Sequence, residues 1–299
     1  MTEQEAVVCM DVGGTEIKAA PVGAGGRLLA PVQHFPADAG RPADALLAHF
    51  AAIALAAADL ARGRTIRGVH LAFPGPFDYE NGVSRMRNLD KYDALYGINL
   101  RESLQRRLAP LGLPGESIRF INDVSAYALG EMRFGRAAGA QRAMFICIGT
   151  GCGSAFGIGG RLAEDTAPGV PPDGYVYAFP FLDGCIDDYI SKRGLLRLTA
   201  ERLGEPLDGL ALAMRAQRGD DAAATGCFRL FGERLRDALL PFLRDFRPDC
   251  LCLGGQITRS AALFLAPLQD ACGALGTRLH VAADTSQTAL QGLSVLGTP

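Results

Sequence analysis

Residues 7–18, VVCMDVGGTEIK, combine an apolar run, an acidic residue and a glycine turn. Val7 to Met10 have the character of a buried strand, and Asp11 stands at its end. The Gly13–Thr15 turn can present amide N–H groups and a hydroxyl to an anion without Cβ atoms in the way. A carboxylate repels a neighbouring phosphate unless Mg²⁺ lies between them, so this pattern favours binding of a magnesium–nucleotide pair. An ordinary β-hairpin turn is the alternative that these residues alone leave open.

Length, composition and charge indicate a globular protein of two lobes or domains. The chain has 299 residues, 48% hydrophobic and 21% charged, which is enough to bury a sizeable core. Its net charge is -2 and its basic residues are scattered, which argues against a nucleic-acid partner. No apolar run reaches the roughly 20 residues that span a bilayer, and the start, MTEQEA, is not typical of a secretory signal. We therefore expect a cytoplasmic protein without a membrane partner, and a homodimer is left open.

The cysteines indicate a reduced protein. Most of the 8 cysteines lie in apolar runs, as at Cys9, Cys147, Cys250 and Cys252. A buried reduced thiol behaves as a small hydrophobic group, so a disulfide framework is not expected in this setting.

Strand and helix patterns alternate along the chain, which predicts an α/β fold that begins with antiparallel hairpins. After the first strand, further strands are expected at residues 17–22, 27–35, 66–73, 117–121, 143–148, 154–158, 161–162, 250–253 and 278–282. Helices are expected at residues 42–62, 100–108, 124–134, 185–203, 220–246, from about 260, and 288–296. The 220–246 helix is expected to be interrupted near Gly226, Gly232 and Pro241.

Polar and glycine residues follow several of the expected strands, where open α/β sheets bind ligands. Gly75 follows the 66–73 strand, Asn88 comes further on, and Asn122 and Asp123 end the 117–121 strand. Each has a structural alternative. Asn88 is typical of a turn, Asp123 is typical of a helix cap, and position alone favours these alternatives.

A second glycine-rich segment, GTGCGSAFGIGG at residues 149–160, follows the 143–148 strand. It lacks the GxxxxGK[ST] pattern of a P-loop, and no helix follows at once, as a dinucleotide fingerprint requires. A hairpin that binds phosphate is the functional interpretation, and a glycine-loosened hairpin is the structural one. Residues 167–184 then predict an ordered loop over a site, because they are rich in Pro, Gly and aromatic residues.

Two glycine-rich hairpins, each after a buried strand, are typical of a duplicated fold whose halves face one nucleotide. The motifs DVGGTEIK, FPGPFD, RNL, INDVSAYALGE, IGTGCGSAFGIGGRL, GCIDDYISKRGL and CLCLGGQI together strongly resemble the ROK family of sugar kinases, in the actin-like ATPase superfamily. The resemblance implies an α/β protein of two RNase H-like domains around a nucleotide and sugar cleft. The smaller domain would comprise residues 1–122 plus 288–299, and the larger one residues 123–287.

The resemblance also implies roles for individual residues. The phosphates and Mg²⁺ of ATP would be held by Asp11, Gly13, Gly14, Thr15, Thr150, Gly151 and Gly153. The adenosine would be backed by Gly254, Gly255 and Gln256. The sugar would lie among Gly75, Asn88, Asn122 and Asp123, and Asp123 matches the family's catalytic base.

The chain departs from the family in one segment. Family members carry GExGH and then CxCGxxGC, where one His and three Cys bind a structural Zn²⁺. Here residues 167–185 are shorter and contain no His, and only Cys185 remains of the cluster, so no structural metal is expected. Asp187 stands where a Glu normally contacts the sugar, and Asp173, Tyr175 or Tyr177 are further candidates to line the pocket.

The sequence therefore predicts ATP-dependent phosphorylation of a hexose or related sugar hydroxyl, with Mg²⁺ and with Asp123 as general base. The alternative is a non-catalytic sugar-binding or regulatory ROK homologue. Regulators of the family carry an N-terminal helix-turn-helix domain, and only six residues precede Val7. The presence of both Asp11 and Asp123 also favours the enzyme.

Overall fold

The computed structural model describes residues 1–217 and 221–297 of the chain, which forms two compact units. Unit 1 comprises Met1–Gly135 and Ser286–Pro299, and unit 2 comprises Arg136–Thr285. The 8 cysteines all lie within the described residues, and none forms a disulfide bond. No helix within the described residues is both long enough and apolar enough to cross a membrane.

Unit 1 contains helix α3, Asp123–Phe134, whereas the boundary expected from the sequence after Asn122 gave that helix to the second domain. Two glycines explain why α3 stays with unit 1. A Cβ on Gly130 would lie 2.0 Å from the carbonyl oxygen of Thr288, and one on Gly292 would lie 1.9 Å from that of Ala126. The backbones of α3 and α9, Thr285–Leu293, therefore meet directly.

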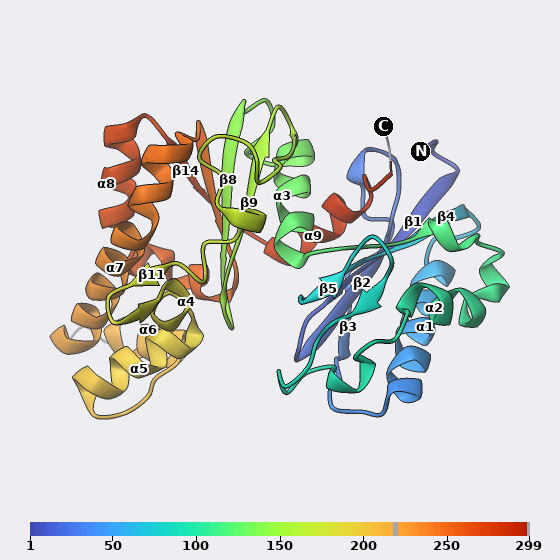
Figure 1. Cartoon of the computed structure of the whole chain (residues 1–299), viewed down its shortest axis with the longest axis horizontal. Coiled ribbons are helices and arrows are strands. Elements are labelled where there is room, and N and C mark those ends of the chain that lie inside the picture. The colour runs from blue at the N-terminus through green and yellow to red at the C-terminus, as the bar shows by residue number, and fades with distance from the viewer. Residues whose placement is uncertain (218–220, 298–299) are drawn as a thin grey trace. The chain divides into compact units, whose positions relative to one another are not determined.

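The sheet of unit 1 has the strand order β3-β2-β1-β4-β7 (Figure 1). Its strands are β1 Glu5–Val12, β2 Glu16–Val22, β3 Gln33–Pro36, β4 Thr65–Ala72 and β7 Ile118–Ile121. The first three form an antiparallel meander, and β4 and β7 run parallel to β1. The strand expected at 27–35 is wrong in extent, because residues 24–26 form a 3-10 turn and Pro31 has no N–H to donate to a ladder.

Helices cover both faces of this sheet. Val8, Met10 and Leu71 belong to a core shared with α1, Ala43–Asp59, and α2, Leu100–Arg107, which lie side by side (Figure 1). Successive side chains of a strand point to opposite faces. His70, the neighbour of Leu71, accordingly points away from α1 and bonds the carbonyl oxygen of Leu293 in α9 at 2.7 Å.

The sheet of unit 2 repeats the same plan, with the strand order β10-β9-β8-β13-β14. Its strands are β8 Arg142–Ile148, β9 Cys152–Ile158, β10 Arg161–Leu162, β13 Cys250–Gly254 and β14 Arg278–Val281. Again a three-strand antiparallel meander is followed by two strands parallel to its first strand. The expected duplication of one α/β plan is confirmed.

The helices of unit 2 are α4 Ile186–Tyr189, α5 Lys192–Leu203, α6 Gly209–Gln217, α7 Ala222–Phe246 and α8 Ala266–Leu275, and Figure 1 shows α7 beside α8. The interruptions expected near Gly226, Gly232 and Pro241 are wrong, since α7 is continuous through all three. Burial of its apolar face outweighs the helix-breaking residues. Asp220, the expected first residue, lies outside the described residues.

Other helix predictions need correction. The single helix expected at 185–203 is two helices, because Ser191 ends the first turn and its Oγ accepts a bond from the Gly194 N–H. Helix α6 was not expected. A 3-10 helix, Gln256–Leu263, precedes α8 where one helix was expected from about residue 260. Two short hairpins complete the fold, β5 Phe77–Asp78 with β6 Val83–Ser84, and β11 Pro180–Phe181 with β12 Gly184–Cys185.

Candidate active site

The β1–β2 hairpin turns tightly after Asp11, which pairs with Lys18 across the two strands. The Gly13 N–H donates to the carbonyl oxygen of Glu16 at 3.0 Å. A Cβ on Gly13 would lie 2.8 Å from that oxygen, so a glycine is required by close approach. Gly14 and Thr15 are exposed at the tip, where their amide and hydroxyl groups can reach a ligand.

Two residues of the segment after Asn88, Lys91 and Tyr92, contact this hairpin. The Tyr92 hydroxyl donates to the carbonyl oxygen of Gly13 at 2.7 Å. Burial raises the pKa of Tyr92, and the carboxylates of Asp11 and Asp38 raise it further, so the phenol stays protonated. The neighbouring Lys91 lies over the tip, with its Cδ atom 3.5 Å from the position that a Cβ on Gly14 would take. Sequence reasoning missed both residues, because they follow the RNL motif in a segment with no regular pattern.

Asn122 and Asp123 occupy different positions at the start of α3. Asn122 is the N-cap, and its Oδ1 accepts bonds from the N–H groups of Val124 at 2.9 Å and Ser125 at 3.3 Å. Asp123 is the first residue of the helix, so the alternative that Asp123 is the cap is wrong. Asn122 is thus the cap, but the Asp123 Oδ1 also accepts a bond of 2.9 Å from the Val124 N–H. The Asp123 Oδ2 is the oxygen that has no hydrogen bond to a described residue and can take another role.

Asp123 is exposed as a residue, but protein atoms surround its carboxyl group and displace solvent from it. Desolvation raises the pKa of Asp123, while the N–H of Val124 and the ammonium group of Lys91 oppose the rise. Because the side chain is exposed, a substrate hydroxyl can reach it. A carboxylate with a raised pKa is a better proton acceptor than an ordinary one.

Tyr79 brings two of the predicted sugar residues together. Its hydroxyl donates to the carbonyl oxygen of Phe73 at 2.9 Å and lies 3.4 Å from the Cβ position of Gly75. The Asn122 Nδ2 group lies 3.5 Å from the same hydroxyl. Asn88 is not drawn into this cluster by any hydrogen bond to a described residue; it is exposed in the left-handed region at φ 58°. Tyr79 was missed, although it follows FPGPFD directly.

The β8–β9 hairpin of unit 2 has a different support. The Gly149 N–H donates to the carbonyl oxygen of Gly151 at 2.9 Å, and the Gly149 carbonyl accepts from the Lys192 N–H at 2.8 Å. Thr150 is exposed at the tip, and Gly153 lies within β9 opposite Cys147. The hairpin predicted from the glycine pattern is therefore present.

Asp187 of α4 braces this hairpin. Its Oδ1 accepts a bond of 2.6 Å from the Cys152 N–H, and its Oδ2 accepts one of 2.6 Å from Arg193. A Cβ on Gly151 would lie 2.9 Å from the same Oδ1. Both oxygens of the carboxylate predicted to contact sugar are thus bonded within unit 2, and its nearest neighbours are the glycine hairpin.

The Gly254–Gln256 segment lies against the end of β8. Gly255 has φ 96°, and a Cβ there would lie 2.3 Å from the carbonyl oxygen of Ile148, so only glycine fits. Its N–H donates to the Thr285 hydroxyl at 2.9 Å. Gln256 is exposed beside it. The structure therefore brings this segment and the β8–β9 hairpin together within unit 2.

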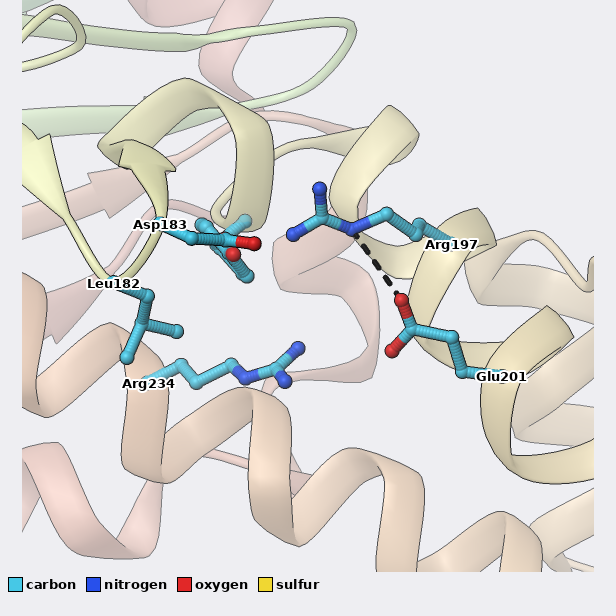
Figure 2. Close-up of a pocket in the computed structure, with 6 residues that line it drawn as sticks. Leu182, Asp183, Arg197, Glu201 and Arg234 are labelled. Atoms are coloured by element: carbon cyan, nitrogen blue, oxygen red, sulfur yellow. Dashed lines mark ion pairs between the residues drawn. The ribbon is translucent and has the colours of Figure 1, made fainter.

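A separate cavity of about 470 Å³ in unit 2 contains none of the predicted site residues. It is lined by Leu182, Asp183, Tyr189, Arg197, Glu201 and Arg234. Figure 2 shows the guanidinium groups of Arg197 and Arg234 directed into the space. Both stack on the Tyr189 ring, at 4.2 and 5.1 Å from its centroid, and two carboxylates balance their charge. This arrangement ties α4, α5 and α7 together.

Comparison with known proteins places the fold and the motifs in one family. The sequence profile described as the ROK family matches residues 7–275. The chain belongs to the ROK family. The α/β fold class expected from the resemblance, with two units built on one plan, is therefore confirmed.

Individual ROK proteins show how far the likeness extends. A glucokinase of Thermotoga maritima is 24% identical over 292 residues, covering 88% of this chain and 86% of the relative. The DNA-binding transcriptional repressor Mlc of Escherichia coli is 22% identical over 246 residues, or 76% of this chain and 58% of the repressor. A ROK glucokinase from Streptomyces griseus, solved with glucose and AMPPNP, has the same fold, with a TM-score of 0.76, 21% identity and coverage of 97% and 98%.

Proposed function

We propose that the chain is an ATP-dependent kinase that phosphorylates a hydroxyl of a hexose or related sugar. The observation that carries the proposal is Asp123 at the start of α3, an exposed residue whose pKa is raised by desolvation and whose neighbour Asn122 is the helix cap. The names of ROK relatives support it, since one is a glucokinase and another was solved with glucose and AMPPNP.

Asp123 is the general base in this proposal. As the sugar hydroxyl oxygen forms a bond to the γ-phosphorus, the bond from that phosphorus to the oxygen of ADP breaks, and Asp123 accepts the hydroxyl proton. Gly75, Asn88 and Asn122 surround the sugar, and Tyr79 joins them because its hydroxyl lies between Gly75 and Asn122.

Mg²⁺-ATP is the second substrate, and the glycine hairpins fit it. Asp11 offers the carboxylate oxygen that a hard cation prefers, and the Gly13–Thr15 tip offers exposed donors to the phosphates. Thr150, Gly151 and Gly153 contribute from the β8–β9 hairpin, and Gly254–Gln256 back the adenosine. Asp187 acts chiefly by shaping its hairpin, because the Cys152 N–H and Arg193 occupy its two oxygens.

Substitution of Asp123 by Asn tests the base directly. Asn keeps the shape and can accept a hydrogen bond, but it cannot take the proton. We expect kcat to fall by roughly 10²- to 10⁴-fold, with the KM for Mg-ATP almost unchanged. ADP release measured across a panel of hexoses, amino sugars and polyols identifies the substrate first. Asp59→Asn, at an exposed carboxylate ending α1, is the control that should keep full activity. An Asp123→Asn enzyme with more than about a tenth of the activity contradicts the assignment.

Asp11→Asn should fail in a different way. A neutral amide is a poorer ligand for Mg²⁺ than a carboxylate, so the KM for Mg-ATP should rise while sugar affinity is kept. The titration of activity with Mg-ATP measures this, and an unchanged KM would assign Asp11 to the fold alone.

A regulatory sugar-binding protein is the second candidate, because the chain is also similar to the Mlc repressor. Saturable binding of a sugar by calorimetry, with no ADP release from ATP, would favour it.

We further expect no structural zinc, although Cys185 is retained. Within the described residues, no group of three or more His, Cys, Asp or Glu could hold a metal. Elemental analysis tests this, and roughly one zinc per chain would contradict it.

A further inference from the structure

Lysine is rare in this chain, and its positions are informative. Of 30 Lys and Arg residues, only Lys18, Lys91 and Lys192 are lysines. All three meet a glycine hairpin. Lys18 pairs with Asp11 across β1 and β2, Lys91 crosses the tip at Gly14, and the Lys192 N–H binds the Gly149 carbonyl. Lysine differs from arginine in carrying a compact point charge, which suits a phosphate in a narrow space.

The backbone fixes Lys91 in place. Its neighbour Tyr92 is fully buried, where its ring packs 5.5 Å from that of Phe73 and 5.8 Å from that of Phe50. The Tyr92 N–H donates to the Ala39 carbonyl at 2.9 Å, in addition to the hydroxyl bond to Gly13. Lys91 is therefore attached to an anchored residue, and its half-buried side chain has a defined path over the hairpin.

The charge of Lys91 has no partner of opposite sign within ion-pair distance among residues 1–217 and 221–297. Lys18 is different, because its ammonium group donates to the Ser286 hydroxyl at 2.6 Å and lies 3.7 Å from a Glu16 carboxylate oxygen. The ammonium group of Lys91 is also close enough to Asp123 to act on its ionisation. An unneutralised cation thus lies between the exposed hairpin tip and the candidate base, within one unit.

We propose that Lys91 contacts the phosphoryl group during its transfer from ATP to the sugar. This rests on the kinase function proposed above. Charge spreads over the phosphoryl oxygens as the bond to ADP breaks and the bond to the sugar oxygen forms, and a preorganised ammonium group stabilises that charge. The proton of the sugar hydroxyl goes to Asp123. The two side chains therefore have complementary roles. Lys91 stabilises the negative charge on the phosphoryl oxygens, and Asp123 accepts the proton.

Lys91→Met, which keeps the apolar stem and removes the charge, tests the contact. Removal of one such electrostatic group should lower kcat by about 10²- to 10³-fold and leave the KM for sugar almost unchanged. Arg87→Met is the matched control, since it removes a cation from the same segment whose guanidinium stacks on Tyr96 at 5.4 Å. Lys91→Arg should recover part of the loss, because it restores the charge in a bulkier, planar form. Circular dichroism checks that all variants fold.

The acidic limb of the kcat profile gives a readout that a structural role would not change. The groups that act on Asp123 are Lys91 and the donors of Asn122 and Val124 at the start of α3. Loss of the Lys91 charge removes an influence that lowers the pKa of Asp123, so the limb should move to higher pH in Lys91→Met only. A Lys91→Met enzyme with more than a third of the wild-type kcat and an unmoved limb overturns the proposal.

Binding of Mg-AMPPNP, measured by calorimetry, separates this proposal from the kinase function. A charged hydrogen bond to phosphate predicts roughly tenfold to hundredfold weaker binding by Lys91→Met than by Arg87→Met. If the wild type binds Mg-AMPPNP but phosphorylates no sugar, the kinase function fails, and this difference alone still decides the Lys91 contact. Equal affinities of the two variants overturn the contact. A wild type that neither binds the nucleotide nor releases ADP overturns both proposals.

Discussion

The two glycine hairpins follow the same sequence plan but are held by different chemistry. In unit 1, the Gly13 carbonyl accepts a bond from the neutral phenol of Tyr92, which is buried among aromatic rings. In unit 2, the Cys152 N–H donates to the carboxylate of Asp187, which is itself paired with Arg193. The first hairpin therefore depends on a side chain fixed by packing, and the second on a side chain fixed by charge.

The difference shows that two units with the same strand plan can hold their hairpins with different side-chain contacts. Both sheets place a tight turn at the end of their first strand, because that strand is buried and the chain must reverse. What surrounds each turn is set by the segment inserted later in each unit. A variant that affects one hairpin should consequently leave the other unchanged.

The largest expected difference between the two units is the stability that unit 1 loses at acidic pH. His70 lies in β4 beside β1, and burial lowers its pKa to about 4. In the unfolded chain, its pKa returns to about 6.5. Between these values the unfolded state binds a proton that the folded state does not, so unit 1 loses stability as pH falls from about 6.5 to 4. The loss should reach about 3 kcal/mol below pH 4.

Hydrogen exchange measures this in each unit separately. The amides of β4 should lose protection on acidification more than those of β13. His70→Asn is the control, since its side-chain amide can still donate to the Leu293 carbonyl but does not titrate. Equal pH dependence of β4 protection in the wild type and this variant would show that His70 is not the cause.

The second expected effect is local to unit 2. Asp187→Ala removes the acceptor of a buried N–H, and an unsatisfied buried donor costs about 1–3 kcal/mol. Denaturation should show that loss of stability, and the KM for Mg-ATP should rise because the β8–β9 hairpin is no longer braced. Asp187→Asn should cost less, since an amide oxygen can still accept from Cys152. Asp165→Ala, at an exposed site of the same unit, is the control. A full effect in Asp187→Asn would mean that the pair with Arg193 matters more than the bond to Cys152.

Sequence patterns predicted the strands, the two hairpins and the family, because each depends on local signals. Apolar runs and paired glycines mark a buried strand and a tight turn wherever they occur. The same local logic failed for α7, where Gly226, Gly232 and Pro241 favoured interruptions that burial of one long apolar face overrides. It also failed for β3, whose length is decided by the turn before it.

The side-chain contacts that hold the two hairpins could not be predicted from the sequence, for a physical reason. Tyr92 and Gly13 are 79 positions apart, and Asp187 and Cys152 are 35 apart, so no local spacing connects them. Asp187 was noticed as a sugar residue through the family motif, but its nearest partners emerged only from the fold. Asn122 and Asp123 show the converse, because these adjacent residues have similar chemistry and the fold was needed to tell them apart. Both accept a bond from the Val124 N–H, but only Asn122 also accepts one from the Ser125 N–H and precedes the helix.

The smallest expected effect is at the first hairpin. Tyr92→Phe removes one hydroxyl and keeps the ring among Phe50 and Phe73, so packing is unchanged. The Gly13 carbonyl is partly exposed and can accept a bond from water instead. We therefore expect a loss of only about 1 kcal/mol, the usual worth of one hydrogen bond. It should appear as faster hydrogen exchange at Gly14 and Thr15, with no change at Thr150 and Gly151. If exchange at both hairpins rises together, their supports are coupled, and the contrast between a packed brace and a charged brace does not hold.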